Sequence, residues 1–98
     1  MKAGIYNYSS WIKGADPQEL TRRFDSLLRL SGFQIVGFTC HHFEPFGFSA
    51  IWLIAESNFA LHTWPEEGKS YIELSSCNRE KLSRFKKILK IKGEEDTP

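Results

Sequence analysis

A proline–glycine turn between two strand-like runs is the feature that most constrains this fold. Pro65-Glu66-Glu67-Gly68 separates residues 59–64, which begin and end with an aromatic side chain, from residues 69–77, in which Ile72 and Leu74 alternate with Tyr71 and Glu73. A four-residue loop of this composition between two such runs is typical of a β-hairpin. The sequence therefore predicts an antiparallel pair of strands in the second half of the chain.

The register of this hairpin predicts a cluster of reactive side chains. If the residues that flank the turn face each other, His62 lies opposite Tyr71, and Cys77 lies opposite Glu56, next to Ser57. Because side chains alternate between the two faces of a strand, His62, Tyr71 and Cys77 should share one face. A serine hydroxyl, an imidazole and a thiol are thus expected to converge near one strand end.

Two amphipathic helices flank the predicted strands. The first follows Asp16-Pro17, which suits a capping residue and a proline in the first turn, and it should end near Gly32. The second follows Asn78, another residue that favours a helix N-terminus. Their inward-facing stripes are Leu20, Phe24, Leu27 and Leu28 in the first helix, and Leu82, Phe85, Ile88 and Leu89 in the second.

Three further segments have strand composition: residues 3–9, 33–43 and 48–55. The last is almost wholly apolar, which predicts a strand covered on both faces. The order of elements predicts an α+β fold, a mainly antiparallel sheet with two helices packed on one face. We expect one domain over residues 1–92, followed by a disordered acidic tail at 93–98.

Composition excludes several classes of protein. A net charge of +1 in 98 residues gives no field that selects nucleic acid or a membrane surface. There is no signal peptide or apolar run long enough to span a membrane, and two cysteines are too few for a disulfide framework. We therefore expect a cytoplasmic protein without nucleic-acid or membrane partners, with a core small enough to gain from packing against a partner.

Two patterns have structural explanations. His41 and His42 are adjacent, so in a strand they point to opposite faces and cannot chelate one ion; no metal site is expected. The basic run of the last helix is expected to form its solvated side, because acidic neighbours cancel its charge. That run comprises Lys81, Arg84, Lys86, Lys87, Lys90 and Lys92.

Several motifs at fixed separations resemble the small prokaryotic members of the S-adenosylmethionine decarboxylase family. They are Glu56-Ser57, the string from Leu61-His62 to Pro65-Glu66, and Cys77. An upstream run at the family's distances adds His41-His42-Phe43, Pro45, Gly47 and Ser49. The resemblance covers residues 32–77 and implies the two-layer sandwich of that family.

The resemblance implies a precursor that cuts its own backbone. In the family, the serine at the position of Ser57 attacks the carbonyl of the residue at Glu56, which turns the peptide bond into an ester. Ser49 is the expected helper at the oxyanion, and His62 the base that removes the α-proton. The new chain end becomes a pyruvoyl group generated from Ser57, which is the implied cofactor.

The same resemblance implies roles in turnover. The pyruvoyl ketone forms a Schiff base with the substrate amine and acts as the electron sink for departing carbon dioxide. Cys77 is the implied proton donor, Phe43 would stack on the adenine, and Glu66 would hold the ribose hydroxyls. The implied activity is decarboxylation of S-adenosylmethionine for polyamine (spermidine) synthesis, by a homodimer whose sites use both chains.

Four features depart from the family pattern. Asn58 stands in place of a histidine, Glu73 in place of an aspartate and Asn78 in place of a glycine, and the first strand lacks the family's carboxylate. Two alternatives therefore stay open. One is a pyruvoyl-dependent decarboxylase of arginine or ornithine, and the other is an unprocessed, non-catalytic homologue that acts by association.

Overall fold

The computed structural model describes residues 4–91 as a single antiparallel sheet with both helices on one face. The strand order is β1-β5-β4-β3-β2. The elements are β1 (Tyr6–Lys13), α1 (Pro17–Leu30), β2 (Ile35–His42), β3 (Phe48–Ile54), β4 (Ser57–Trp64), the 3₁₀ turn η1 (Pro65–Glu67), β5 (Lys69–Ser76) and α2 (Arg79–Ile91). This arrangement confirms the predicted fold class.

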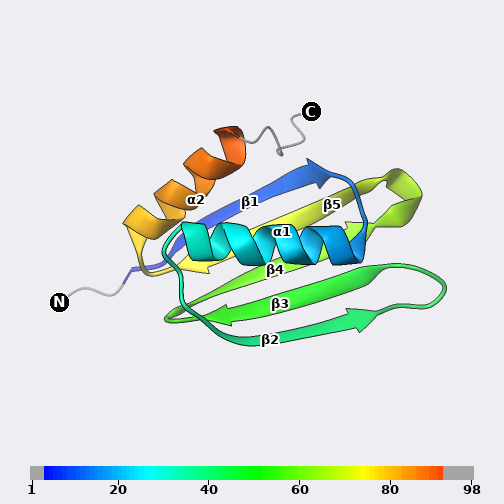
Figure 1. The fold of residues 1–98 in the computed structure, drawn as a ribbon, viewed down its shortest axis with the longest axis horizontal. Coiled ribbons are helices and arrows are strands. Elements are labelled where there is room, and N and C mark those ends of the chain that lie inside the picture. The colour runs from blue at the N-terminus through cyan, green and yellow to red at the C-terminus, as the bar shows by residue number, and fades with distance from the viewer. Residues whose placement is uncertain (1–3, 92–98) are drawn as a thin grey trace.

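The core lies between the sheet and the two helices (Figure 1). Its centre is aromatic: the ring of Phe85 in α2 lies 6.3 Å from that of Phe24 in α1 and 5.5 Å from that of Phe59 in β4. The sheet face beneath the helices is called the covered face. The predicted helical stripes are buried against it, with Ile88 only partly enclosed.

The predicted hairpin and its register are confirmed. β4 and β5 pair with His62 opposite Tyr71 and Trp64 opposite Lys69. The turn closes through Gly68, whose φ of 64° is a left-handed conformation that glycine adopts without steric cost. Asn78 also caps α2 as predicted, because its side-chain oxygen accepts a hydrogen bond of 3.0 Å from the Lys81 N–H.

Two predictions about the strands were wrong. β1 lies at Tyr6–Lys13 rather than at residues 3–9, because its pairing with β5 continues to Lys13 opposite Lys69 and buries Ile12. β3 is covered on one face only, and Ile51 and Leu53 are 46% and 56% exposed on the other. The predicted tail at 93–98 lies outside the described residues.

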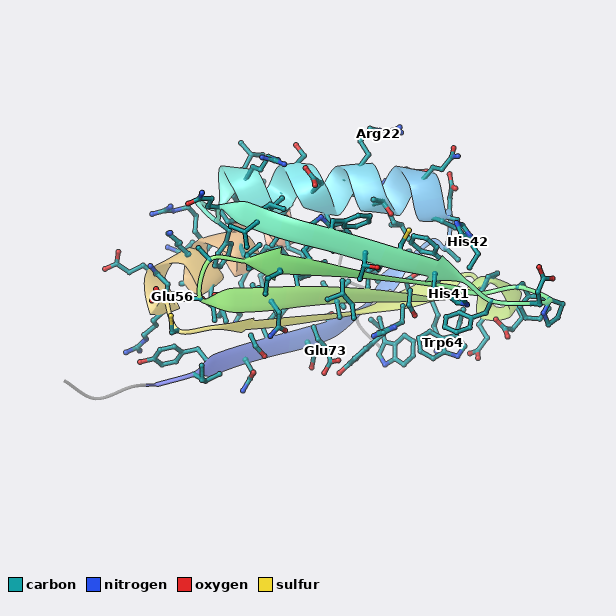
Figure 2. The ribbon with its side chains drawn as sticks, turned by 90° about the horizontal axis from the view of Figure 1, so that it is seen from below. Arg22, His41, His42, Glu56, Trp64 and Glu73 are labelled. Atoms are coloured by element: carbon teal, nitrogen blue, oxygen red, sulfur yellow. The ribbon has the colours of Figure 1, made fainter. Side chains whose placement is uncertain are left out.

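The sheet face opposite the helices is called the open face. No helix among residues 4–91 packs on it (Figure 2). Strands β1, β5, β4 and β3 present a mixture of apolar and polar side chains on this face. These residues are Trp11, Ser49, Ile51, Leu53, Ala60, His62, Tyr71 and Glu73. Within the described part of the chain, no helix is long and apolar enough to cross a membrane.

The basic residues of α2 are exposed, but several have contacts. Arg84 donates a hydrogen bond of 3.0 Å to the Ser31 carbonyl, which ties α2 to the end of α1. The Lys86 ammonium lies 5.2 Å from the centre of the Tyr8 ring in β1. Two basic side chains of α2 therefore also contact the end of α1 and strand β1.

A carboxylate of α1 holds the largest side chain of the core. The Asp25 carboxylate accepts hydrogen bonds from the Trp52 indole N–H, at 3.1 Å, and from the Arg29 guanidinium, at 2.8 Å. Trp52 is fully buried, so this bond satisfies its N–H. Burial raises the pKa of Asp25, but the two hydrogen bonds and the charge of Arg29 outweigh burial, and the pKa lies below its ordinary value of 3.8.

We expect Asp25→Asn to lower the free energy of unfolding by about 1 kcal/mol at pH 7. A lowered folded-state pKa contributes stability above the unfolded-state value of 3.8, and this contribution disappears as pH falls through the folded pKa. The difference from the parent should therefore vanish near pH ~2 in urea unfolding. Asp16→Asn is the control, because Asp16 makes no side-chain capping bond. An equal loss at both pH values would contradict this account.

Candidate active site

The residues singled out from the sequence fall into two groups at opposite ends of the sheet. The first group, called the thiol cluster, comprises Glu56, Ser57 and Cys77. It lies where β3 turns into β4 and where β5 ends. Figure 2 shows Glu56 at one end of the sheet, with His41 and Trp64 toward the other.

The backbone of the thiol cluster is strained at Glu56, the residue that precedes the bond marked for cleavage by the resemblance. β3 and β4 are joined by a two-residue turn, Ala55-Glu56, with Ile54 paired to Ser57. Glu56 has a φ of 60° and is the one non-glycine residue with positive φ among residues 4–91. A left-handed conformation costs a residue with a Cβ about 1 kcal/mol or more. The tight turn therefore holds an exposed residue, Glu56, in an unfavourable backbone conformation directly before Ser57.

The thiol lies beside this turn, as the hairpin register predicts. Cys77 follows the last residue of β5 and is exposed. Its Sγ is 3.7 Å from Oε2 of Glu56, to which the thiol donates. The thiol is thus held against the side chain of Glu56, the residue that precedes Ser57.

The Ser57 side chain points away from the thiol. Ser57 pairs with Ile54 and Ser76, both buried, so its side chain belongs to the covered face. Its hydroxyl donates a hydrogen bond of 2.8 Å to the Ser76 hydroxyl. Rotation about one side-chain bond would be enough to change its approach to the preceding carbonyl.

The second group lines a shallow cavity of about 270 Å³, called the imidazole pocket. It includes four of the residues singled out from the sequence. Nδ1 of His62 and the Ser49 hydroxyl share a hydrogen bond of 2.7 Å across paired positions of β4 and β3. The other ring nitrogen, Nε2, makes no hydrogen bond within residues 4–91. The cavity is lined by Phe43, Phe46, Gly47, Phe48, Ser49, His62, Thr63, Trp64 and Glu66.

An aromatic wall continues from this pocket across the open face. The ring of Trp11 in β1 lies 5.2 Å from that of Trp64 and 5.1 Å from that of Tyr71. The Lys69 ammonium lies 4.5 Å from the centre of the Trp11 ring. No role was predicted for Trp11, although it pairs with Tyr71, which is itself opposite His62.

The predicted convergence of imidazole, hydroxyl and thiol was wrong for a single chain. His62 is five positions beyond Ser57 along β4, about 17 Å at ~3.3 Å per residue. The two also belong to opposite faces, because their positions differ by an odd number. The register brings Cys77 to Glu56, as predicted, but no register can move His62 along its own strand.

The adjacent histidines lie on opposite faces of β2, as predicted (Figure 2). The His41 ring contacts Phe43, whereas the His42 ring contacts Phe48. Residues 4–91 contain no group of three His, Cys, Asp or Glu side chains able to hold a metal ion. A larger cavity, of about 620 Å³, lies between α1 and β2 and shares only Phe48 with the lining of the imidazole pocket.

The two groups supply different chemistry. The thiol cluster offers a hydroxyl directly after a residue in an unfavourable backbone conformation, and a free thiol. The imidazole pocket offers a base and a hydroxyl, with aromatic and carboxylate side chains around a small cavity. Together they contain the components of backbone cleavage and of binding a small aromatic molecule.

Comparison with known proteins agrees with the chemistry of these two groups of residues. A family model described as S-adenosylmethionine decarboxylase matches residues 11–92. The S-adenosylmethionine decarboxylase proenzyme of Thermotoga maritima is 40% identical over 67 residues, covering 63% of this chain and 52% of that protein. The proenzyme of Acidithiobacillus ferrooxidans is 43% identical over 49 residues, covering 50% and 37%. The chain thus spans about half the length of the curated relatives it matches.

A solved structure shares the fold. The crystal structure of the adenosylmethionine decarboxylase from Aquifex aeolicus matches with a TM-score of 0.77 at 17% identity, covering 98% of this chain and 86% of that one. At this identity the likeness concerns the fold alone. The family match, which extends over most of the sequence, carries the assignment: this chain belongs to the S-adenosylmethionine decarboxylase family.

Proposed function

We propose that this chain is a self-processing precursor of a pyruvoyl-dependent decarboxylase that acts on S-adenosylmethionine in polyamine (spermidine) biosynthesis. The observation that carries the proposal is the left-handed Glu56, which puts an unfavourable backbone conformation at the residue before Ser57, while the Cys77 thiol contacts the Glu56 side chain. The family to which the chain belongs, and relatives named as proenzymes, support the same conclusion.

Processing begins with the chain's own serine. The Ser57 Oγ forms a bond to the carbonyl carbon of Glu56 as the C–N bond breaks, and the hydroxyl proton passes to the nitrogen, leaving an ester and an amine. A base then removes the Cα proton of residue 57, and the Glu56 carboxylate departs. The remaining enamine takes up water and loses ammonia, which leaves the ketone of a pyruvoyl group at the start of the second chain.

The residues present fit a pyruvoyl group at position 57. The pyruvoyl group would stand directly after the exposed turn, where cleavage leaves two chain ends. The Cys77 thiol contacts the side chain of the turn residue Glu56. When formed, the group supplies an electron-withdrawing carbonyl for the loss of carbon dioxide from an amino acid. In this proposal the Cys77 thiol returns a proton to the substrate carbon.

The base for processing comes from a second copy of the chain in this proposal. His62 is about 17 Å from Ser57 within one chain. A two-fold axis parallel to the sheet and perpendicular to the strands would lay the thiol cluster of one chain against the imidazole pocket of the other. Exposed Ile51 and Leu53 on the open face favour such a sheet-to-sheet contact, because apolar side chains on an uncovered face gain from burial.

Substrate recognition is assigned to the imidazole pocket. Phe43, which is half exposed at its rim, offers a face for stacking on adenine, and the Glu66 carboxylate offers acceptors for ribose hydroxyls. Ser49, which is hydrogen-bonded to His62, would stabilise the oxyanion on the neighbouring chain during cleavage.

Denaturing mass spectrometry of the purified protein tests this function. We expect two fragments, residues 1–56 and 57–98, the second without a free amino terminus, and an uncut chain for Ser57→Ala. Addition of S-adenosylmethionine should release carbon dioxide only with the processed protein. An intact parent chain after prolonged incubation would overturn the proposal and favour a non-catalytic homologue, whereas product from arginine or ornithine alone would overturn the substrate.

A further inference from the structure

The hydroxyl of Ser57 is held by a partner that the proposed mechanism does not use. Ser76, the last residue of β5, is fully buried and directly opposite Ser57. Its Oγ accepts a hydrogen bond of 2.8 Å from the Ser57 hydroxyl and one of 2.9 Å from the Asn78 N–H. The same Oγ is 3.4 Å from the Asn78 carbonyl, to which it donates.

These contacts use the full hydrogen-bonding capacity of Ser76. A hydroxyl has one proton to donate and two lone pairs to accept with. Ser76 donates its proton to the Asn78 carbonyl and accepts hydrogen bonds from the Ser57 hydroxyl and the Asn78 N–H. With the Ser76 proton directed toward the Asn78 carbonyl, Ser76 is the acceptor of the Ser57 bond. The Ser57 proton is engaged, and both lone pairs of its Oγ stay available.

We propose that Ser76 is a positioning residue for self-cleavage, which orients the Ser57 hydroxyl for attack on the Glu56 carbonyl. The inference deepens the proposed function and rests on it. An engaged proton restricts rotation of the hydroxyl group, and free lone pairs are what the attack on a carbonyl carbon requires.

The main-chain contacts of Ser76 hold its hydroxyl in a fixed position opposite Ser57. Its partners on the far side are main-chain groups of Asn78, so the orientation of Ser57 depends on the backbone that leads from β5 into α2. Cys77 lies between Ser76 and Asn78 in that backbone. One short segment therefore positions both the attacking hydroxyl and the thiol beside the scissile bond.

The test compares cleavage rates of Ser76→Ala, Ser76→Thr and a matched control. Ser70→Ala is the control, because Ser70 is also buried on the covered face of β5 and loses one hydrogen bond of 2.8 Å, to the Gly14 carbonyl. Rates are followed by denaturing mass spectrometry, with hydroxylamine added in parallel to trap the ester. Circular dichroism melts compare the folding of all variants.

We expect Ser76→Ala to slow ester formation by about 10- to 100-fold, as for a misplaced reacting group. Ser76→Thr, which keeps the hydroxyl, should stay within about threefold of the parent, and Ser70→Ala should match the parent rate. An unchanged or faster rate in folded Ser76→Ala would overturn the inference, as would equal slowing by Ser70→Ala. A parent that never cleaves would overturn the proposed function itself, which is a separate result.

Discussion

Two variants that are each unable to cleave should regain cleavage when they are paired. Ser57→Ala lacks the nucleophile, and His62→Ala lacks the base, so neither should process alone. In a dimer of one of each, the His62→Ala chain keeps its Ser57 and receives His62 from its neighbour. We therefore expect this chain, and not the Ser57→Ala chain, to be cut at one of the two sites of the pair.

The reason for this expectation is a distance along one strand. The two residues are five positions apart in β4, about 17 Å, which no side-chain rotation can span. The experiment co-expresses the two chains with different affinity tags, isolates the mixed dimer through both tags and identifies the cut chain by denaturing mass spectrometry.

The control replaces the other imidazole of the open face. His41 contacts Phe43 but makes no hydrogen bond to Ser49, so His41→Ala alone should still process. An uncut mixed dimer would contradict the shared site, and cleavage of His62→Ala by itself would remove His62 from the mechanism. A mixed dimer that cannot be isolated at all would contradict the proposed sheet-to-sheet pairing.

The sequence was most informative where local chemistry and periodicity agreed. The Pro65–Gly68 turn determined the pairing of β4 with β5, and through it the contact between Cys77 and Glu56. The helices were predictable because their apolar stripes and end residues point to the same boundaries. The apolar run of β3 was misleading, since Ile51 and Leu53 resemble core residues but are exposed in the single chain. A partner over the open face would account for their composition.

The turn at Ala55-Glu56 was not predictable from residue type. Two-residue hairpin turns favour glycine and asparagine, which adopt positive φ readily, and neither is present here. Local preference is overridden by the pairing of β3 with β4 on either side. Conflicts of this kind between sequence and conformation are expected at functional sites, where strain serves the chemistry.

Ser76 was within reach of the sequence but was missed. The register that pairs Cys77 with Glu56 also pairs Ser76 with Ser57, one step further into the hairpin. The prediction concerned the open face, which His62 and Cys77 share, whereas Ser57 and Ser76 belong to the covered face. The hydrogen bond between two hydroxyls follows from the pairing only once Ser57 is known to belong to the covered face.

Cys77→Ala should separate processing from turnover. Self-cleavage depends on Ser57, its carbonyl target and a base, none of which is the thiol, so the variant should still yield two fragments. Decarboxylation should fall by about 10²- to 10⁴-fold, the usual contribution of a positioned acid or base. The measurement is carbon dioxide release per processed chain, with the processed fraction determined by mass spectrometry.

The second cysteine of the chain provides the matched control for this variant. Cys40 is also an exposed free thiol, but it lies on β2 beside the larger cavity. Cys40→Ala should therefore retain full turnover, and equal losses in both variants would indicate a general effect on the fold. If Cys77→Ala turns over normally, the proton comes from another group. The carboxylates of Glu56 would then be the nearest candidates, because the Cys77 thiol donates to its side chain and cleavage leaves its new terminal carboxylate at the same turn.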